Sequence, residues 1–80
     1  MNQQEAFNII KKSVAIVCPN FDGDLTLETD LMAEEILDSL DSMSFLFELE
    51  TLVGKSIPQI DEDFEDFQVS KLVELIVANA

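Results

Sequence analysis

The 80-residue chain lacks several side chains on which catalysis and phosphate binding usually depend. It contains no histidine, arginine, tyrosine or tryptophan. Histidine is the commonest general base, and a Ser-His-Asp triad cannot be built without it. Carboxylate pairs such as Asp61 and Asp63 remain, but acids that lie this densely beside turn residues usually form a solvated surface. Any chemistry in which the chain takes part is therefore expected to use a catalyst that another protein supplies.

Cysteine is also scarce. Cys18 is the only one, which excludes an intramolecular disulfide and a multi-cysteine metal site. The simplest interpretation of Cys18 is a buried apolar thiol. The segment Asp22-Gly23-Asp24 resembles part of a calcium-binding loop. Aligning Gly23 with the glycine of that loop, however, places Cys18 at the first ligand position, where calcium requires an oxygen ligand. No metal site is expected.

Positive charge is nearly absent, with 4 lysines against 17 acidic residues and a net charge of -13. Nucleic acids and anionic membranes both bind to clustered lysine or arginine, so neither is an expected partner. A basic protein partner would be attracted, although the charge could also serve solubility alone. Mutual repulsion between copies of such an acidic chain favours a monomer.

Long apolar runs are missing too. No stretch approaches the roughly 20 apolar residues that cross a bilayer. The N-terminus lacks the basic start and uninterrupted apolar stretch of a secretory signal, so a cytoplasmic location is expected. The 48% of hydrophobic residues nevertheless favours a folded chain, and the length suits a single small domain over residues 1–80.

Apolar residues at steps of three and four predict an amphipathic helix over residues 3–17, which Pro19 ends. Residues 19–38 are predicted to form a long ordered loop, because turn residues come early in this segment and apolar residues come later. The loop residues expected to pack on the core are Leu25, Leu27, Leu31, Met32, Ile36 and Leu37.

A second helix is predicted to begin at Asp38-Ser39 and to end at Gly54. Its expected apolar face comprises Leu40, Met43, Leu46, Leu49 and Val53, widened by Phe45, Phe47 and Leu52. Ile57-Pro58 predicts an extended turn, residues 61–67 predict a short helix, and Ser70 is a candidate cap for a last helix that ends near Ala78. The expected fold is all-α: a small four-helix bundle of three main helices and one short helix, with a long first loop and no strand.

The dipeptide Asp-Ser occurs twice within a few residues, as Asp38-Ser39 and Asp41-Ser42. Either pair suits a helix start, because a short polar side chain accepts hydrogen bonds from the first free amides. Apolar residues follow Ser39 by one, four, seven and ten places, and an Ile-Pro pair follows it by 18 and 19 places.

This pattern resembles that of acyl carrier proteins and related carrier domains, in which the serine of an Asp-Ser-Leu motif carries a 4'-phosphopantetheine arm. Ile36-Leu37-Asp38-Ser39-Leu40 matches the motif, and counting from Ser42 brings the Ile-Pro pair three residues too close. The resemblance extends from the first helix to the closing KLVELI at residues 71–76. It implies that Ser39 is the attachment site and that Asp38 is the adjacent motif residue.

The resemblance implies a carrier and not an enzyme. A phosphopantetheinyl transferase would attach the arm from coenzyme A, and the thiol of the arm would hold acyl or aminoacyl intermediates as thioesters in fatty-acid, polyketide or related biosynthesis. Asp38 would either assist a metal-dependent transferase or only cap the helix. The expected docking surface for basic loading and accepting enzymes comprises Asp38, Asp41 and Glu50, with Leu40 and Met43 as the apolar contact. The family often shelters the acyl chain in a space between its helices. Six residues are expected either to line such a space or simply to form the core: Met43, Phe45, Phe47, Leu49, Phe64 and Phe67.

The chain departs from the family pattern in two ways. Glu35 and Ile36 stand where a glycine is usual, so the turn before the helix must form without a residue that tolerates positive φ. Ser44 and Thr51 occupy positions where many members carry acids, which indicates a specialised carrier.

Two other interpretations compete with the carrier. In the first, the chain is an acidic non-covalent interaction module that binds a basic partner, and Ser39 only starts the helix. In the second, it is a small acid-base enzyme, but no further polar constellation accompanies the paired carboxylates.

Overall fold

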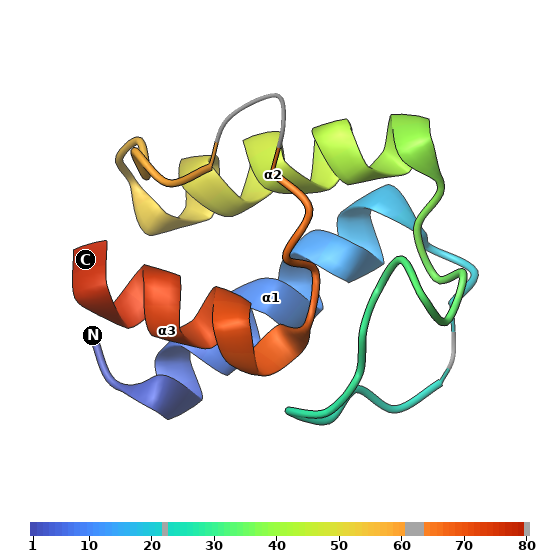
Figure 1. The fold of residues 1–80 in the computed structure, drawn as a ribbon, viewed down its shortest axis with the longest axis horizontal. Coiled ribbons are helices and arrows are strands. Elements are labelled where there is room, and N and C mark those ends of the chain that lie inside the picture. Colours follow the sequence, from blue (N-terminus) through green and yellow to red (C-terminus); the bar gives the residue numbers. More distant parts are fainter. Residues whose placement is uncertain (22, 61–63, 80) are drawn as a thin grey trace.

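Three helices joined by long irregular segments make up the part of the chain that the structure describes. The structure is a computed structural model that describes residues 1–21, 23–60 and 64–79. The helices are α1 (Gln3–Val17), α2 (Ser39–Val53) and α3 (Val69–Asn79). α1 packs against both of the others, with α2 along one side of the molecule and α3 along another (Figure 1). None of the helices in the described ranges has the length and apolar character needed to cross a membrane.

Local capping explains where the first two helices begin and end. The side chain of Asn2 accepts a hydrogen bond of 2.8 Å from the Glu5 amide at the start of α1. At the end of α2, Gly54 adopts the left-handed conformation with φ of 91°, which glycine tolerates best. The predicted limits of both helices, including the Gly54 cap, are confirmed.

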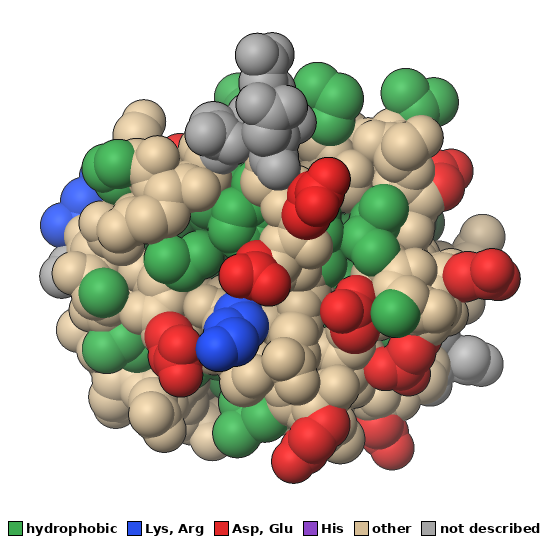
Figure 2. Space-filling model, in the orientation of Figure 1, with side chains coloured by type: hydrophobic (Ala, Val, Ile, Leu, Met, Phe, Trp, Pro, Cys, Tyr) green, Lys and Arg blue, Asp and Glu red, His purple; other side chains and the backbone are tan. Residues whose placement is uncertain are grey.

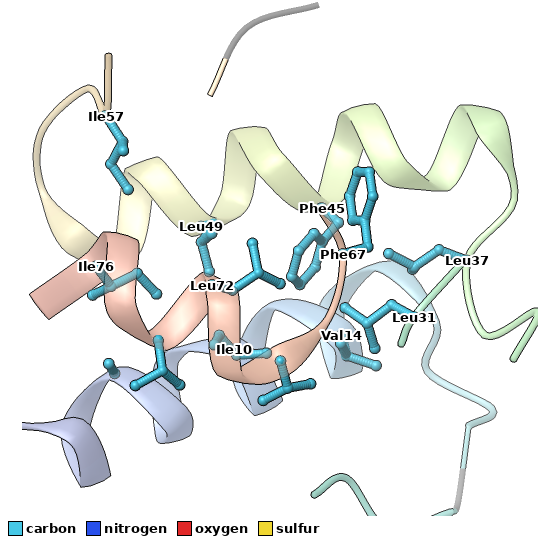
Figure 3. Packing of buried hydrophobic residues seen from close by; sticks show 13 residues of the cluster. Ile10, Val14, Leu31, Leu37, Phe45, Leu49, Ile57, Phe67, Leu72 and Ile76 are labelled. Carbon is cyan, nitrogen blue, oxygen red and sulfur yellow. The ribbon is translucent and has the colours of Figure 1, made fainter. Parts of the chain in front are cut away.

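The core draws on all three helices and on both connecting segments (Figure 3). The rings of Phe45 and Phe67 lie with their centroids 6.3 Å apart near its centre. Around them pack the other buried hydrophobic residues: Ala6, Ile10, Val14, Leu31, Leu37, Leu49, Ile57, Val69, Leu72, Val73 and Ile76.

The side of α2 that faces the core differs from the predicted one. Ser42, Phe45 and Leu49 are its buried residues. Leu40, Met43 and Phe47 belong to the predicted apolar face of the helix, but their side chains are 76%, 66% and 69% exposed and do not pack in the core. The helix therefore carries two apolar stripes, and only one of them packs on the rest of the molecule.

The long first loop is pinned to the start of α3. The Leu31 amide donates to the Phe67 carbonyl at 3.0 Å, and the Val69 amide donates to the Thr29 carbonyl at 2.8 Å. These bonds flank an isolated antiparallel bridge between Asp30 and Gln68, and the described residues contain no longer strand. We refer to this pairing of residues 29–31 with residues 67–69 as the clasp. Of the six loop residues expected to pack on the core, five do so, whereas Leu27 is 47% exposed.

The segment between α2 and α3 departs most from prediction. Residues 61–63 of the expected short helix lie outside the described residues, and residues 64–67 are irregular and not helical. The Ile57-Pro58 turn is present, with the Ile60 amide donating to the Ile57 carbonyl at 2.9 Å. Ser70 does not cap α3. The helix begins at Val69, and the Ser70 amide donates instead to the carbonyl of Leu27 across the chain.

Candidate functional site

The candidate site is the N-terminus of α2. Asp38 is its N-cap and has an extended backbone. One carboxylate oxygen, Oδ1, accepts hydrogen bonds from the amides of Leu40 at 3.0 Å and Asp41 at 2.7 Å. Because these are among the first amides without a partner inside the helix, Asp38 fixes the position at which α2 begins.

The two serines of the repeated Asp-Ser pair have different surroundings. Ser39 is the first residue of α2 and is exposed. Ser42 is only 9% exposed, and its hydroxyl donates to the Ser39 carbonyl at 2.9 Å. Of these two serines, Ser39 is therefore the exposed one and Ser42 is the buried one.

The turn that leads into α2 forms without glycine. Glu35 adopts a left-handed backbone with φ of 59°, and it is the one residue other than glycine with positive φ in the described ranges. The Leu31 carbonyl accepts hydrogen bonds from the amides of both Ile36 and Leu37 at 3.0 Å. Leu37 is buried beside these bonds. The turn is therefore held by backbone bonds and an apolar anchor directly before Asp38.

Cys18 lies where the end of α1 meets this turn. Its Sγ is 3.4 Å from the Ile36 carbonyl oxygen and 3.9 Å from Oδ2 of Asp41. Burial raises the pKa of the thiol, and the negative charges of Asp41 and Asp38 raise it further. The thiol is thus kept protonated and can donate to these oxygens. It is half-buried with polar neighbours, so the expectation of a buried apolar thiol was only partly correct.

A groove opens beside Ser39, between α2 and the segment that precedes α3. It has a volume of about 450 Å³, and its lining residues are Met32, Ser39, Ser42, Met43, Phe64, Glu65 and Phe67. A second hollow of about 270 Å³ lies further along α2 and shares Ser42, Met43 and Phe64 with the first. The six residues that were expected either to form core or to shelter an acyl chain therefore separate. Phe45 and Leu49 lie only in the core, Phe67 is buried in the core and also lines the first hollow, and Met43, Phe47 and Phe64 line one or both hollows.

The residues expected to contact partners also separate into two kinds. Leu40 and Met43 are largely exposed. Asp41 and Glu50 are half-buried and already have contacts within the chain. Oδ2 of Asp41 faces the Cys18 thiol, and Oε2 of Glu50 accepts the amide of Ile57 at 2.7 Å.

Phe47 is the surface residue that the sequence prediction missed. Its ring lies on the same exposed stripe as Leu40 and Met43, because residues three and four apart in a helix share one face. The helical spacing of these three residues can be recognised in the sequence. The same helix has a second apolar stripe with Phe45 and Leu49, and helical spacing alone does not indicate which of the two stripes is buried. Figure 2 shows hydrophobic side chains projecting along the edge of the molecule where α2 runs, and acidic side chains spread over the face in view.

Comparisons of the chain with protein-family models, with curated proteins and with solved structures give no match. Its function is therefore inferred from its own residues and their geometry.

Proposed function

We propose that this protein is a carrier in which the Ser39 hydroxyl bears a 4'-phosphopantetheine arm and presents acyl or aminoacyl intermediates to other enzymes. The observation that carries the proposal is the contrast between the two neighbouring serines. Ser39 is exposed at a helix start, whereas the hydroxyl of Ser42 is buried and donates to the carbonyl of Ser39. The serine that the motif singles out is thus also the one that a modifying enzyme could reach.

The surroundings of Ser39 fit such an arm. A phosphodiester on its hydroxyl would lie beside the positive end of the α2 dipole, where anions are favoured. The groove next to Ser39 offers Met32, Met43 and Phe64 as apolar contacts for the rest of the arm or for a short acyl chain. When bound, the group supplies a thiol on a long flexible arm that forms thioesters.

Attachment of the arm requires a partner enzyme, because the chain has no histidine to act as a base. Ser39 Oγ would form a new bond to the phosphorus of the pantetheine phosphate in coenzyme A. The pyrophosphate bond would break, 3',5'-ADP would leave, and the serine proton would pass to a base on the transferase. Asp38 is adjacent, and its Oδ1 already caps α2.

Intact-protein mass spectrometry tests the proposal. We expect wild-type protein to gain the mass of one phosphopantetheine when it is incubated with coenzyme A, Mg²⁺ and a phosphopantetheinyl transferase of broad specificity. Ser39→Ala should gain nothing. Ser42→Ala, the matched control, should be modified as the wild type is. No mass gain by wild-type protein with two different transferases would refute the carrier function.

An acidic interaction module is the second candidate, and the exposed apolar stripe of α2 supports it. In that case Ser39 serves only as the first residue of the helix. Ser39→Ala would then leave partner binding intact, whereas it should abolish the function of a carrier.

A further inference from the structure

Aromatic rings fill the interior next to the groove beside Ser39. Phe45 points into the core from α2, Phe67 enters from the segment that precedes α3, and both are buried. The centroids of the two rings lie 6.3 Å apart (Figure 3). The half-buried Phe64 packs edge to face on Phe67, with centroids 5.4 Å apart. Because Phe64 and Phe67 line the groove and Phe45 lies behind Phe67, three rings lead from the surface into the core.

The backbone of Phe67 is fixed by hydrogen bonds on both sides of the residue. Its amide donates to the Glu65 carbonyl at 3.1 Å, and its carbonyl accepts the Leu31 amide at 3.0 Å as part of the clasp. Protein interiors are close-packed, so the Phe67 ring has little room to turn aside while its backbone stays in place. Admitting an acyl chain between the helices would therefore disturb the clasp or the packing of Phe45, and both changes cost free energy.

The open hollows near Phe64 offer poor shelter to a long alkyl chain. Met43 and Phe47, which border the hollow further along α2, are 66% and 69% exposed, so a chain there would remain in contact with water. A further hollow of about 730 Å³ shares Phe64 and Glu65 with the groove, and its other lining residues are Gln59, Asp66, Lys71, Glu74, Leu75 and Ala78. An alkyl chain there would remove water from charged side chains, which is unfavourable.

The groove beside Ser39 suits a small cargo. Its volume of about 450 Å³ has to take the pantetheine part of the arm as well as the cargo. The hydroxyl of Ser42 and the carboxylate of Glu65 belong to its lining. Since Ser42 donates its hydrogen to the Ser39 carbonyl, its oxygen remains an acceptor, as does the carboxylate of Glu65. These acceptors suit the amine or hydroxyl of a short cargo better than a row of methylene groups.

We propose that Phe45 and Phe67 close the interior of this carrier, so that it holds short acyl or aminoacyl groups whose thioester stays accessible to water, and not long fatty acyl chains. This inference rests on the proposed carrier function and names the class of its cargo. Phe67 is the residue that limits the cargo, since it lines the groove on one side and packs against Phe45 on the other.

The test compares how fast hydroxylamine cleaves the thioesters of short and long cargo. A phosphopantetheinyl transferase of broad specificity would load the carrier with an acetyl, butyryl or octanoyl arm from the matching coenzyme A thioester. The nitrogen of hydroxylamine then bonds to the thioester carbonyl carbon, the carbon–sulfur bond breaks, and the arm keeps the protonated thiol. Intact-protein mass spectrometry follows the loss of the acyl group, and each rate is divided by that of the free coenzyme A thioester. For wild-type protein we expect the three ratios to agree within about twofold, because no cargo is withdrawn from the solvent.

Phe67→Ala should create an apolar space beneath the groove, and such cavities bind apolar groups. We expect the octanoyl thioester on this variant to be cleaved at least about fivefold more slowly than on wild type, with the acetyl thioester unchanged. Phe47→Ala is the matched control, because it removes the same ring from the surface of α2 and opens no space in the core. Its ratios should equal those of wild type. Circular dichroism should show that the variants are folded, and the smaller truncation Phe67→Val replaces Phe67→Ala if the latter unfolds.

Protection of the long chain on wild-type protein is the result that overturns the inference. If its octanoyl thioester were cleaved about fivefold more slowly than its acetyl thioester, the chain would be buried, although the carrier function would stand. Unchanged octanoyl cleavage on a folded Phe67 variant would equally overturn the role of Phe67. The wild-type comparison decides the class of cargo even if neither Phe67 variant folds. Failure of wild-type protein to accept any arm is a different result, since it refutes the carrier function itself.

Discussion

At the scale of single residues, Glu35 is the clearest case in which the backbone demands a conformation that its side chain disfavours. Its φ of 59° lies in the left-handed region. For a residue with a Cβ atom, this conformation costs roughly 1–2 kcal/mol of conformational free energy, whereas for glycine it costs little. The turn before Asp38 is kept in this shape by the bonds from Ile36 and Leu37 to the Leu31 carbonyl, which offset the strain.

We therefore expect Glu35→Gly to stabilise the fold. The gain should be about 0.5–1 kcal/mol, because relief of strain exceeds the extra freedom that glycine gives the unfolded chain. Urea denaturation would show it as a higher midpoint with an unchanged slope.

Ala33→Gly supplies the matched control for that substitution. Ala33 lies in the same turn, is exposed and does not have positive φ. Glycine there should lower stability by about 0.5–1 kcal/mol, the opposite sign. If both variants were destabilised, the left-handed strain at Glu35 would not be the dominant effect.

At the scale of elements, Asp38 has one observed role at the start of α2 and a second role that depends on the proposed carrier function. The carboxylate caps the helix, and it could also assist a metal-dependent transferase. Asp38→Asn keeps a side-chain oxygen for the amides of Leu40 and Asp41, so its free energy of unfolding should stay within a few tenths of a kcal/mol of wild type. Asp38→Ala removes the cap and should cost about 1 kcal/mol.

The same pair of variants separates capping from any role with the transferase. If capping is the whole role, Asp38→Asn should accept phosphopantetheine at the wild-type rate. A folded Asp38→Asn protein that is modified much more slowly would instead show that the negative charge acts in the transfer. Chemical denaturation and the time course of holo-protein formation give the two measurements.

The ends of α1 and α2 could be predicted from the sequence because they depend on local chemistry. Asp38 and Gly54 each act on neighbouring backbone groups, and those interactions need nothing from the rest of the molecule. The same local signal placed Ser39 at the first turn of α2, which is where the structure has it. Its exposure, and the burial of Ser42, depend on which side of α2 meets α1.

The buried side of α2 could not be predicted in the same way. Leu40, Met43 and Phe47 form one stripe, and Phe45 and Leu49 lie on another, so helical periodicity alone does not choose between them. The stripe that packs on α1 includes Ser42, whose hydroxyl is satisfied by the Ser39 carbonyl. A polar residue with its hydrogen bond already made can be buried at little cost, and a hydrophobicity pattern takes no account of this.

The segment before α3 was mispredicted for a tertiary reason. Phe64 and Phe67 have helical spacing, but their rings meet edge to face with centroids 5.4 Å apart, and residues 64–67 are irregular. The Phe67 carbonyl and the amides of Val69 and Ser70 bond to the distant first loop. Ser70 therefore became an ordinary residue of α3, because the clasp sets the start of that helix.

At the scale of the whole molecule, the net charge of -13 should make stability depend on salt. Repulsion among so many acids destabilises the compact state, and dissolved ions screen it. We expect Tm to rise by roughly 4 °C between low salt and 0.3 M NaCl, which corresponds to about 0.5–1 kcal/mol for a domain of this size. Thermal unfolding followed by circular dichroism would measure the shift. A Tm that falls as salt is added would mean that attractive charge pairs outweigh the repulsion.

The clasp also bears on how the chain folds. Its two halves lie far apart in sequence, so joining them requires the closure of a long chain segment that contains all of α2. Contacts of that kind are slow to form, whereas the turns of a helix close quickly. Helical structure can thus form before the clasp does, and the closing of the clasp would then fix residues 29–31 and 67–69 in one cooperative event.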